Sequence, residues 1–221
     1  MELKAIDISV SVSSGLPVWP GTPAVEFIPL LDGSTGNGSV DTVYRASLHA
    51  GTHIDAPAHY IVSGRKISEV ALDVFVGDAF VADFSHAGPG SLITGDDLER
   101  KMIDSRARRL LLRTANSRLW SGTRGFETGY TALDVSAADW LAQRGMLLVG
   151  IDYFSIERFD GDGSVHRRLL SNDVIVLESI DLAMVREGWY RLVCLPIKMH
   201  GVEAAPARAV LFPAEDGKAK G

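Results

Sequence analysis

The run His49-Ala50-Gly51-Thr52-His53-Ile54-Asp55-Ala56-Pro57-Ala58-His59 constrains the fold more than any other feature of this 221-residue chain. In a straight strand, His49 and His53 would lie about 13 Å apart, too far to share one metal ion. A helix would bring them together, but Pro57 and the Gly51-Thr52 pair oppose a helix. We therefore expect a strand that ends at His49 and a bend at Gly51, whose backbone tolerates angles that other residues avoid.

This run also has the composition of a metal site. Imidazole and carboxylate groups are the side chains that bind zinc and its divalent neighbours. A lone histidine is usually an ordinary polar residue with a hydrogen-bond partner, but three histidines and an aspartate around a glycine bend are harder to explain in that way. His59 lies beyond Pro57 and is either a further ligand or a free base that accepts a proton from water.

A second and weaker cluster lies more than a hundred residues later. His166 begins an expected helix, and Glu178 ends the apolar strand Val174-Ile175-Val176-Leu177. A carboxylate at the end of a buried strand requires a partner, because burying an unpaired charge is costly. Glu178 is therefore either an exposed strand end or a metal ligand. The loop Asp160-Gly161-Asp162-Gly163-Ser164 lacks the later acidic ligands of a calcium loop, which argues against calcium.

The rest of the chain mixes strands with fewer helices. Apolar or alternating stretches predict strands at residues 6–12, 25–31, 42–49, 77–83, 109–113, 146–151, 174–177, 190–195 and 209–212. Helices are expected to begin near Thr94, Ser136 and Val165. Strand–helix–strand units near residues 94–113 and 136–151 indicate an α/β fold with a mixed sheet. We expect a single domain over residues 1–213 and a flexible tail at 214–221.

Charge and hydropathy exclude several functional classes. The formal net charge is −6 and the basic residues are scattered, so we expect no nucleic-acid partner. No apolar run approaches the roughly 20 residues that span a bilayer, and no leader is visible, so we expect no membrane partner and a cytoplasmic location. The single cysteine, Cys194, lies in an apolar run and is expected to be a small buried hydrophobic residue.

The spacing His49-x-Gly-Thr-His53-x-Asp55-x-Pro57-x-His59 resembles the signature of the cyclase-like metal-dependent hydrolases, the group that includes bacterial kynurenine formamidase and isatin hydrolase. The resemblance extends over nearly the whole chain. The supporting segments are Val18-Trp19-Pro20-Gly21, Gly150-Ile151-Asp152, His166 with Glu178 twelve residues later, Leu195-Pro196-Ile197-Lys198, and Ala205-Pro206-Ala207-Arg208-Ala209-Val210-Leu211.

The resemblance implies a fold and a set of roles. The fold would be a small α/β domain with a barrel-like sheet, assembled as a homodimer or homotetramer. The implied ligands of one or two divalent ions, zinc first and manganese as the alternative, are His49, His53, Asp55, His166 and Glu178. Asp55 and Glu178 would bridge if two ions bind. His59 would be the general acid/base, and Trp19 would line the pocket of a small-molecule substrate.

The implied reaction is the hydrolysis of a C–N bond in a small amide, formamide or lactam by metal-activated water. Two alternatives remain open: a metal-dependent cyclase or dehydratase, and a metal-binding protein without turnover. The chain departs from the kynurenine branch at Tyr153-Phe154-Ser155, where that branch carries Thr-Pro-Ser, which predicts a different pocket and a substrate other than N-formylkynurenine. It also carries Ser179, where glycine is common.

Overall fold

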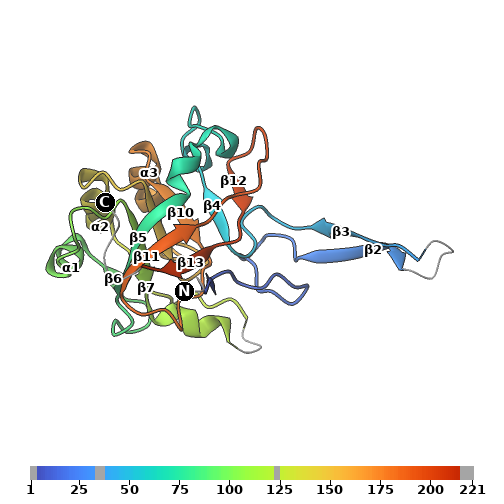
Figure 1. The fold of residues 1–221 in the computed structure, drawn as a ribbon, viewed down its shortest axis with the longest axis horizontal. Helices are drawn as coiled ribbons and strands as arrows, with labels where there is room; N and C mark the ends of the chain where they lie inside the picture. Colours follow the sequence, from blue (N-terminus) through green and yellow to red (C-terminus); the bar gives the residue numbers. More distant parts are fainter. Residues whose placement is uncertain (1–3, 33–37, 122–124, 215–221) are drawn as a thin grey trace.

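The fold is built on one large mixed sheet that curls into a half-barrel. The computed structural model describes residues 4–32, 38–121 and 125–214, so residues 215–221 of the expected tail lie outside the described residues. Nine strands form the sheet, in the order β1-β13-β11-β5-β7-β9-β10-β4-β12 (Figure 1). Their bounds, in that order, are Ile6–Asp7, Val210–Pro213, Gly188–Val193, Val76–Asp83, Arg109–Arg113, Leu148–Ile151, Ile175–Glu178, His53–Asp55 and Ala204–Pro206. The expected α/β fold with a mixed, partly barrel-like sheet is confirmed.

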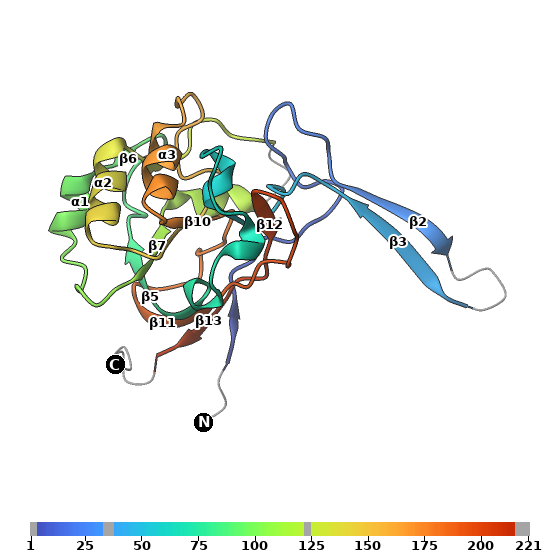
Figure 2. The same cartoon turned by 90° about the horizontal axis from the view of Figure 1, so that it is seen from above.

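The four central strands β5, β7, β9 and β10 are parallel, and the outer strands pair antiparallel. Parallel neighbours require crossover connections. The helices α1 (Gly95–Arg100), α2 (Val135–Gln143) and α3 (Ser164–Ser171) lie in these crossovers, and Figure 2 shows them side by side on one side of the sheet. Thr94 and Asp134 accept hydrogen bonds from the first turns of α1 and α2 as N-caps.

Two apolar layers hold the sheet, and the alternation within β7 separates them. Leu110 and Leu112 pack in the layer that contains Leu98 of α1 and Leu141 of α2. Leu111 points the other way, into the layer enclosed by the curl of the sheet. All of these side chains are buried. Because the sheet is covered on one face and curled on the other, residues 110–112 of β7, 148–151 of β9 and 175–177 of β10 are apolar and buried.

The N-terminal strand is shorter than predicted. A strand was expected over residues 6–12, but β1 covers only Ile6–Asp7. Beyond it, side chains accept hydrogen bonds from two backbone N–H groups: the Ser9 N–H donates to Asp7 Oδ1 (3.0 Å), and the Val10 N–H donates to Thr52 Oγ1 (2.9 Å). The second bond attaches the N-terminal segment to Thr52, just before β4.

A long hairpin of β2 (Glu26–Asp32) and β3 (Val40–Arg45) projects away from the rest of the molecule (Figures 1 and 2). It carries exposed large apolar side chains at Phe27, Ile28, Leu30, Val40, Val43 and Tyr44. The remaining elements are short: β6 (Leu92–Ile93), β8 (Ala132–Leu133), and the 3₁₀ helices η1 (Pro57–His59), η2 (Ile67–Glu69), η3 (Leu72–Val74) and η4 (Ala115–Trp120). None of the helices in the described residues has the length and apolar character needed to cross a bilayer.

Candidate metal centre

The bend at Gly51 is present, but the strand before it ends earlier than predicted. We expected a strand that ends at His49; β3 instead ends at Arg45, and His49 lies in a turn. Ser47 closes this turn, because its carbonyl accepts from the Ala50 N–H (3.1 Å) and its hydroxyl from the His49 N–H (3.3 Å). Gly51 then adopts φ +72°, and the chain enters β4 two residues later.

Gly51 allows the two halves of the run to meet. A Cβ atom at this position would lie 2.9 Å from Val12 Cγ2, in a backbone conformation that L-residues rarely adopt. We expect Gly51→Val to lower metal affinity at least 10-fold and the free energy of unfolding by about 2 kcal/mol or more. Isothermal titration with Zn²⁺ and urea denaturation measure the two effects. Gly21→Val is the matched control, since Gly21 also has positive φ but lies in open space. Equal losses of metal affinity in both variants would contradict this role of Gly51.

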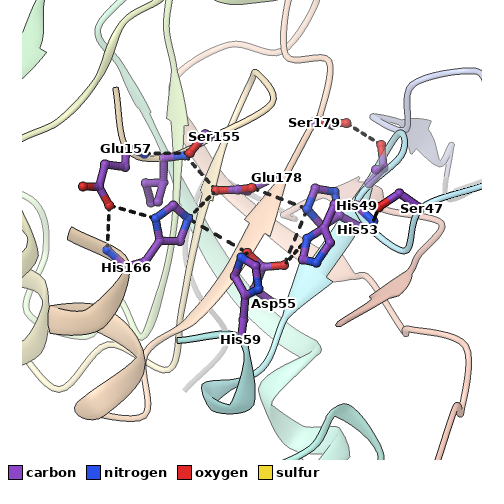
Figure 3. A network of polar contacts seen from close by, with 12 residues as sticks. Ser47, His49, His53, Asp55, His59, Ser155, Glu157, His166, Glu178 and Ser179 are labelled. Atoms are coloured by element: carbon purple, nitrogen blue, oxygen red, sulfur yellow. Dashed lines mark hydrogen bonds and ion pairs between the residues drawn. The ribbon is translucent and has the colours of Figure 1, made fainter. Parts of the chain in front are cut away.

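Asp55 lies at the centre of the site, with four imidazoles around it (Figure 3). Its Oδ1 atom is 3.0 Å from Nδ1 of His49 and 3.5 Å from Nε2 of His53. Its Oδ2 atom is 3.8 Å from Nε2 of His59 and 4.0 Å from Nε2 of His166. The Asp55 side chain is fully buried. Both oxygens therefore face nitrogen donors and no solvent.

Glu178 brings the second predicted cluster to the same place. It ends β10, and the antiparallel pairing of β10 with β4 sets it opposite His53. Its Oε2 atom is 3.4 Å from Nε2 of His53, and its Oε1 atom is 3.2 Å from Nε2 of His166. The Ile156 N–H donates to the same Oε1 atom (2.7 Å). The structure thus brings together all five residues expected as ligands, and His59 beside them.

The buried donor atoms of this cluster fit a divalent cation. His53 Nε2 and both carboxylate oxygens of Asp55 are inaccessible and have no hydrogen-bond partner within the described part of the chain. Such atoms are costly to bury unless an ion satisfies them. Ligand atoms lie within 4.8 Å of one another in two sets, His53-Asp55-Glu178 and His49-Asp55-His59, and the two sets share Asp55.

In three of the four histidines, the ring nitrogen that points away from the cluster also lies close to an acceptor. The pairs are His49 Nε2 with Glu203 Oε1 (3.4 Å), His53 Nδ1 with the Gly51 carbonyl (2.8 Å), and His166 Nδ1 with Glu157 Oε2 (2.9 Å). Metal-binding histidines characteristically donate their other N–H to a carboxylate or a carbonyl. His59 differs, because no described residue accepts a hydrogen bond from its ring.

The charges of the cluster control protonation in the metal-free protein. Burial lowers the pKa of His49, but the neighbouring Asp55 outweighs it and raises this pKa to about 9. Burial likewise opposes the charged form of His166, yet hydrogen bonds to Glu157 and Glu178 raise its pKa to about 10. At neutral pH both rings hold a proton that a metal ion must displace, so metal binding releases protons.

A cavity of about 250 Å³ opens beside these groups. Its lining includes Trp19, Thr22, Ser47, His49, His59, Tyr60, Phe154, Ser155, His166 and Glu178. The Trp19 ring packs against Phe126 and Phe159, with ring centroids 5.2 Å away in each case. The lining of the cavity therefore combines the aromatic side chains of Trp19, Tyr60 and Phe154 with imidazoles and the Glu178 carboxylate, a composition suited to a flat ligand with a polar reactive group.

Four residues of this region were not assigned a role from the sequence. Glu157 and Glu203 contact ligand candidates from outside, Tyr60 stacks on His166 with ring centroids 4.7 Å apart, and Phe154 lines the cavity. Only Phe154 had a signal, as part of the departure at residues 153–155. The other three act on rings that tertiary folding brings to them, so no local spacing reveals them.

The comparisons with known proteins agree on one family. The model of a family described as "Putative cyclase" matches residues 6–158. The kynurenine formamidase of Salinibacter ruber is 34% identical over 216 residues, covering 97% of this chain and 100% of that protein. The solved structure of a predicted metal-dependent hydrolase from Bacillus stearothermophilus is 31% identical with a TM-score of 0.81, covering 96% of this chain and 99% of that one. An isatin hydrolase bound to thioisatinate is 19% identical with a TM-score of 0.84, covering 97% and 94%, which shows a shared fold.

Proposed function

The chain belongs to the cyclase family, and from the chemistry of its site we propose that it is a metal-dependent hydrolase of a small amide, formamide or lactam. The observation that carries this proposal is the buried cluster around Asp55, in which unpartnered carboxylate and imidazole atoms face one another beside an aromatic cavity. Similarity to kynurenine formamidases and to a predicted metal-dependent hydrolase supports the same reaction class.

The proposed metal ligands are His49, His53, Asp55, His166 and Glu178. Nitrogen and oxygen donors without thiolate suit zinc, which we propose as the native ion, and also manganese. The position of Asp55 in both ligand sets leaves room for one ion or for two that share its carboxylate. When bound, a divalent ion lowers the pKa of a water molecule and polarises a substrate carbonyl.

His59 is the proposed general acid/base. Its ring lines the cavity, 3.8 Å from Asp55 Oδ2, and has no outer acceptor among the described residues to hold it as a ligand. A ring placed in this way can accept a proton at Nε2 from the attacking water and return it to the nitrogen that leaves. Trp19 is the proposed substrate-binding residue, because it lines the cavity and its ring packs against Phe126 and Phe159.

A substrate panel with metal removal tests the proposed function. We expect the purified protein to hydrolyse an N-formyl aniline or an aryl lactam, and to lose at least 90% of this activity after treatment with a chelator. Addition of Zn²⁺ or Mn²⁺ should restore it. Product analysis by mass spectrometry separates the reactions: hydrolysis adds about 18 Da to an opened lactam and splits an N-formyl aniline into the aniline and formate, whereas dehydration or cyclisation removes about 18 Da. Tight metal binding with no turnover of any amide, lactam or ester would favour a binding protein instead.

We also propose that the protein assembles as a homodimer or homotetramer. The β2–β3 hairpin supports this, because a two-stranded hairpin is marginal by itself and this one exposes Phe27, Leu30 and Val40. Light scattering should give at least twice the chain mass of 23.8 kDa. A mass of one chain at micromolar concentration would contradict the assembly.

A further inference from the structure

We propose that Glu157 is a positioning residue that holds the His166 ring in the one orientation, with a hydrogen on Nδ1, in which its Nε2 atom is directed at the metal site. This inference rests on the proposed metal site and adds a residue to it. Glu157 lies outside the ligand cluster, on the far side of the His166 ring from Glu178 (Figure 3). It is buried, although it belongs to the loop between β9 and α3.

Three N–H groups converge on this carboxylate. Its Oε1 atom accepts from the Gly163 N–H (2.7 Å), and its Oε2 atom accepts from the backbone N–H of His166 (3.3 Å) and from His166 Nδ1 (2.9 Å). The loop curls tightly to allow this, with Gly163 at φ +82°. A side chain at Gly163 would meet Tyr60 and Arg167 at less than 3 Å. The backbone therefore encloses Glu157 so that both of its oxygens act only as acceptors.

The contact at Nδ1 determines which nitrogen of His166 is free. An ionised carboxylate only accepts, so Nδ1 must carry the hydrogen of this bond. In the neutral ring, Nε2 then has a lone pair, and this atom faces Glu178 Oε1 at 3.2 Å and Asp55 Oδ2 at 4.0 Å. The Tyr60 ring lies nearly parallel to the imidazole, at 13°, and limits rotation of its plane. Glu157 and Tyr60 together direct Nε2 to the ligand cluster.

If Glu157 only stabilised the start of α3, its substitution would have a different effect from the one that the positioning role predicts. Glu157 also accepts from the backbone N–H of His166 in the first turn of α3, whose N-cap Gly163 has no side chain to do so. If capping were its only function, Glu157→Gln would lower stability slightly and leave metal binding unchanged. In the proposed role, glutamine removes the negative charge that holds the hydrogen on His166 Nδ1, and its NH₂ group must face a donor, either His166 Nδ1 or the Gly163 N–H. Where the NH₂ group faces Nδ1, the ring moves its hydrogen to Nε2 or turns away; where it faces Gly163, the loop that holds Glu157 against the ring is displaced. In each case Nε2 is a weaker ligand.

Cobalt titration of the metal-free, full-length protein distinguishes the two roles. Co²⁺ is a spectroscopic probe, since its visible absorption depends on the number and type of ligands. We expect Glu157→Gln to weaken Co²⁺ binding by 10- to 100-fold, the effect typical of losing an outer partner of a metal-bound histidine, and to change the visible spectrum. Glu157→Asp, which keeps a carboxylate, should recover most of the affinity. Asp160→Asn is the matched control, because Asp160 lies in the same loop but pairs with Arg158 at the surface.

The possible results distinguish misfolding of the variant, failure of the positioning role and absence of the metal site. Circular dichroism of the metal-free variants shows whether Glu157→Gln folds, and Glu157→Asp tests the role if it does not. Wild-type Co²⁺ affinity and spectrum in a folded Glu157→Gln protein would overturn the inference, as would equal losses in the glutamine and aspartate variants. Failure of the wild-type protein to bind Co²⁺ or Zn²⁺ would instead refute the proposed metal site itself.

Discussion

Replacement of Asp55 by asparagine should abolish both metal binding and turnover while the protein remains folded. Asp55 is the one carboxylate common to both sets of ligand atoms, and its two oxygens face His49, His53, His59 and His166. An amide in its place removes the negative charge and directs an N–H group at the cluster. Because a bound ion contributes several kcal/mol to transition-state stabilisation, we expect turnover to fall at least 10³-fold.

Metal content by elemental analysis and steady-state kinetics measure these losses. Asp139→Asn is the matched control, because it removes a carboxylate whose ion pair with Arg168 lies at the surface, at 2.9 Å. Pairs of that kind contribute at most about 1 kcal/mol, so metal content and turnover should stay at wild-type values. Retention of metal and activity in a folded Asp55→Asn protein would mean that the ion, if any, binds elsewhere.

Replacement of His59 by alanine should have the opposite combination of effects: turnover falls and metal remains. Loss of a general acid/base typically lowers the rate by 10²- to 10⁴-fold. Metal should remain because five other ligand candidates are unchanged, three of them histidines with outer acceptors at Glu203, Gly51 and Glu157. His86→Ala is the control, since His86 is exposed and outside the site.

The measurement that decides the role of His59 is the metal content of the His59→Ala protein beside its kcat. His59 also lies close enough to His49 and Asp55 to be a ligand. If metal content and kcat fall together, His59 is a ligand and the proton is moved by another group. If kcat does not change, His59 is neither ligand nor base, and the assignment fails.

The sequence predicted the elements whose pattern is local. Strand β7 reads as an apolar run because both faces of the central sheet are covered, and α2 begins at a capping aspartate and ends just before Gly145, which has φ +64°. Strands β4 and β12 were missed, because each has three residues and exists only through pairing with distant segments. Their length is too short for any periodicity to appear.

Within the site too, the residues with a local sequence pattern were predicted from that pattern, and those that depend on distant pairing were not. The run from His49 to His59 indicated a metal site because its ligand candidates are close in sequence. His166 and Glu178 came from resemblance, and their approach to Asp55 depends on the pairing of β10 with β4. Ser179, noted only as a departure from glycine, has φ +56°, a left-handed conformation that explains why glycine is common there. The outer carboxylate Glu157 had no sequence signal, because it binds a backbone turn and a ring rather than an ion.

The metal-to-chain ratio of protein purified without chelators is the most direct test of the metal site. The buried, unpartnered atoms of His53 and Asp55 predict a bound divalent ion in the folded protein. Elemental analysis against protein concentration should give between one and two ions per chain, with zinc or manganese predominant. A ratio well below one in protein that is folded and has not been exposed to chelators would contradict the proposed metal site.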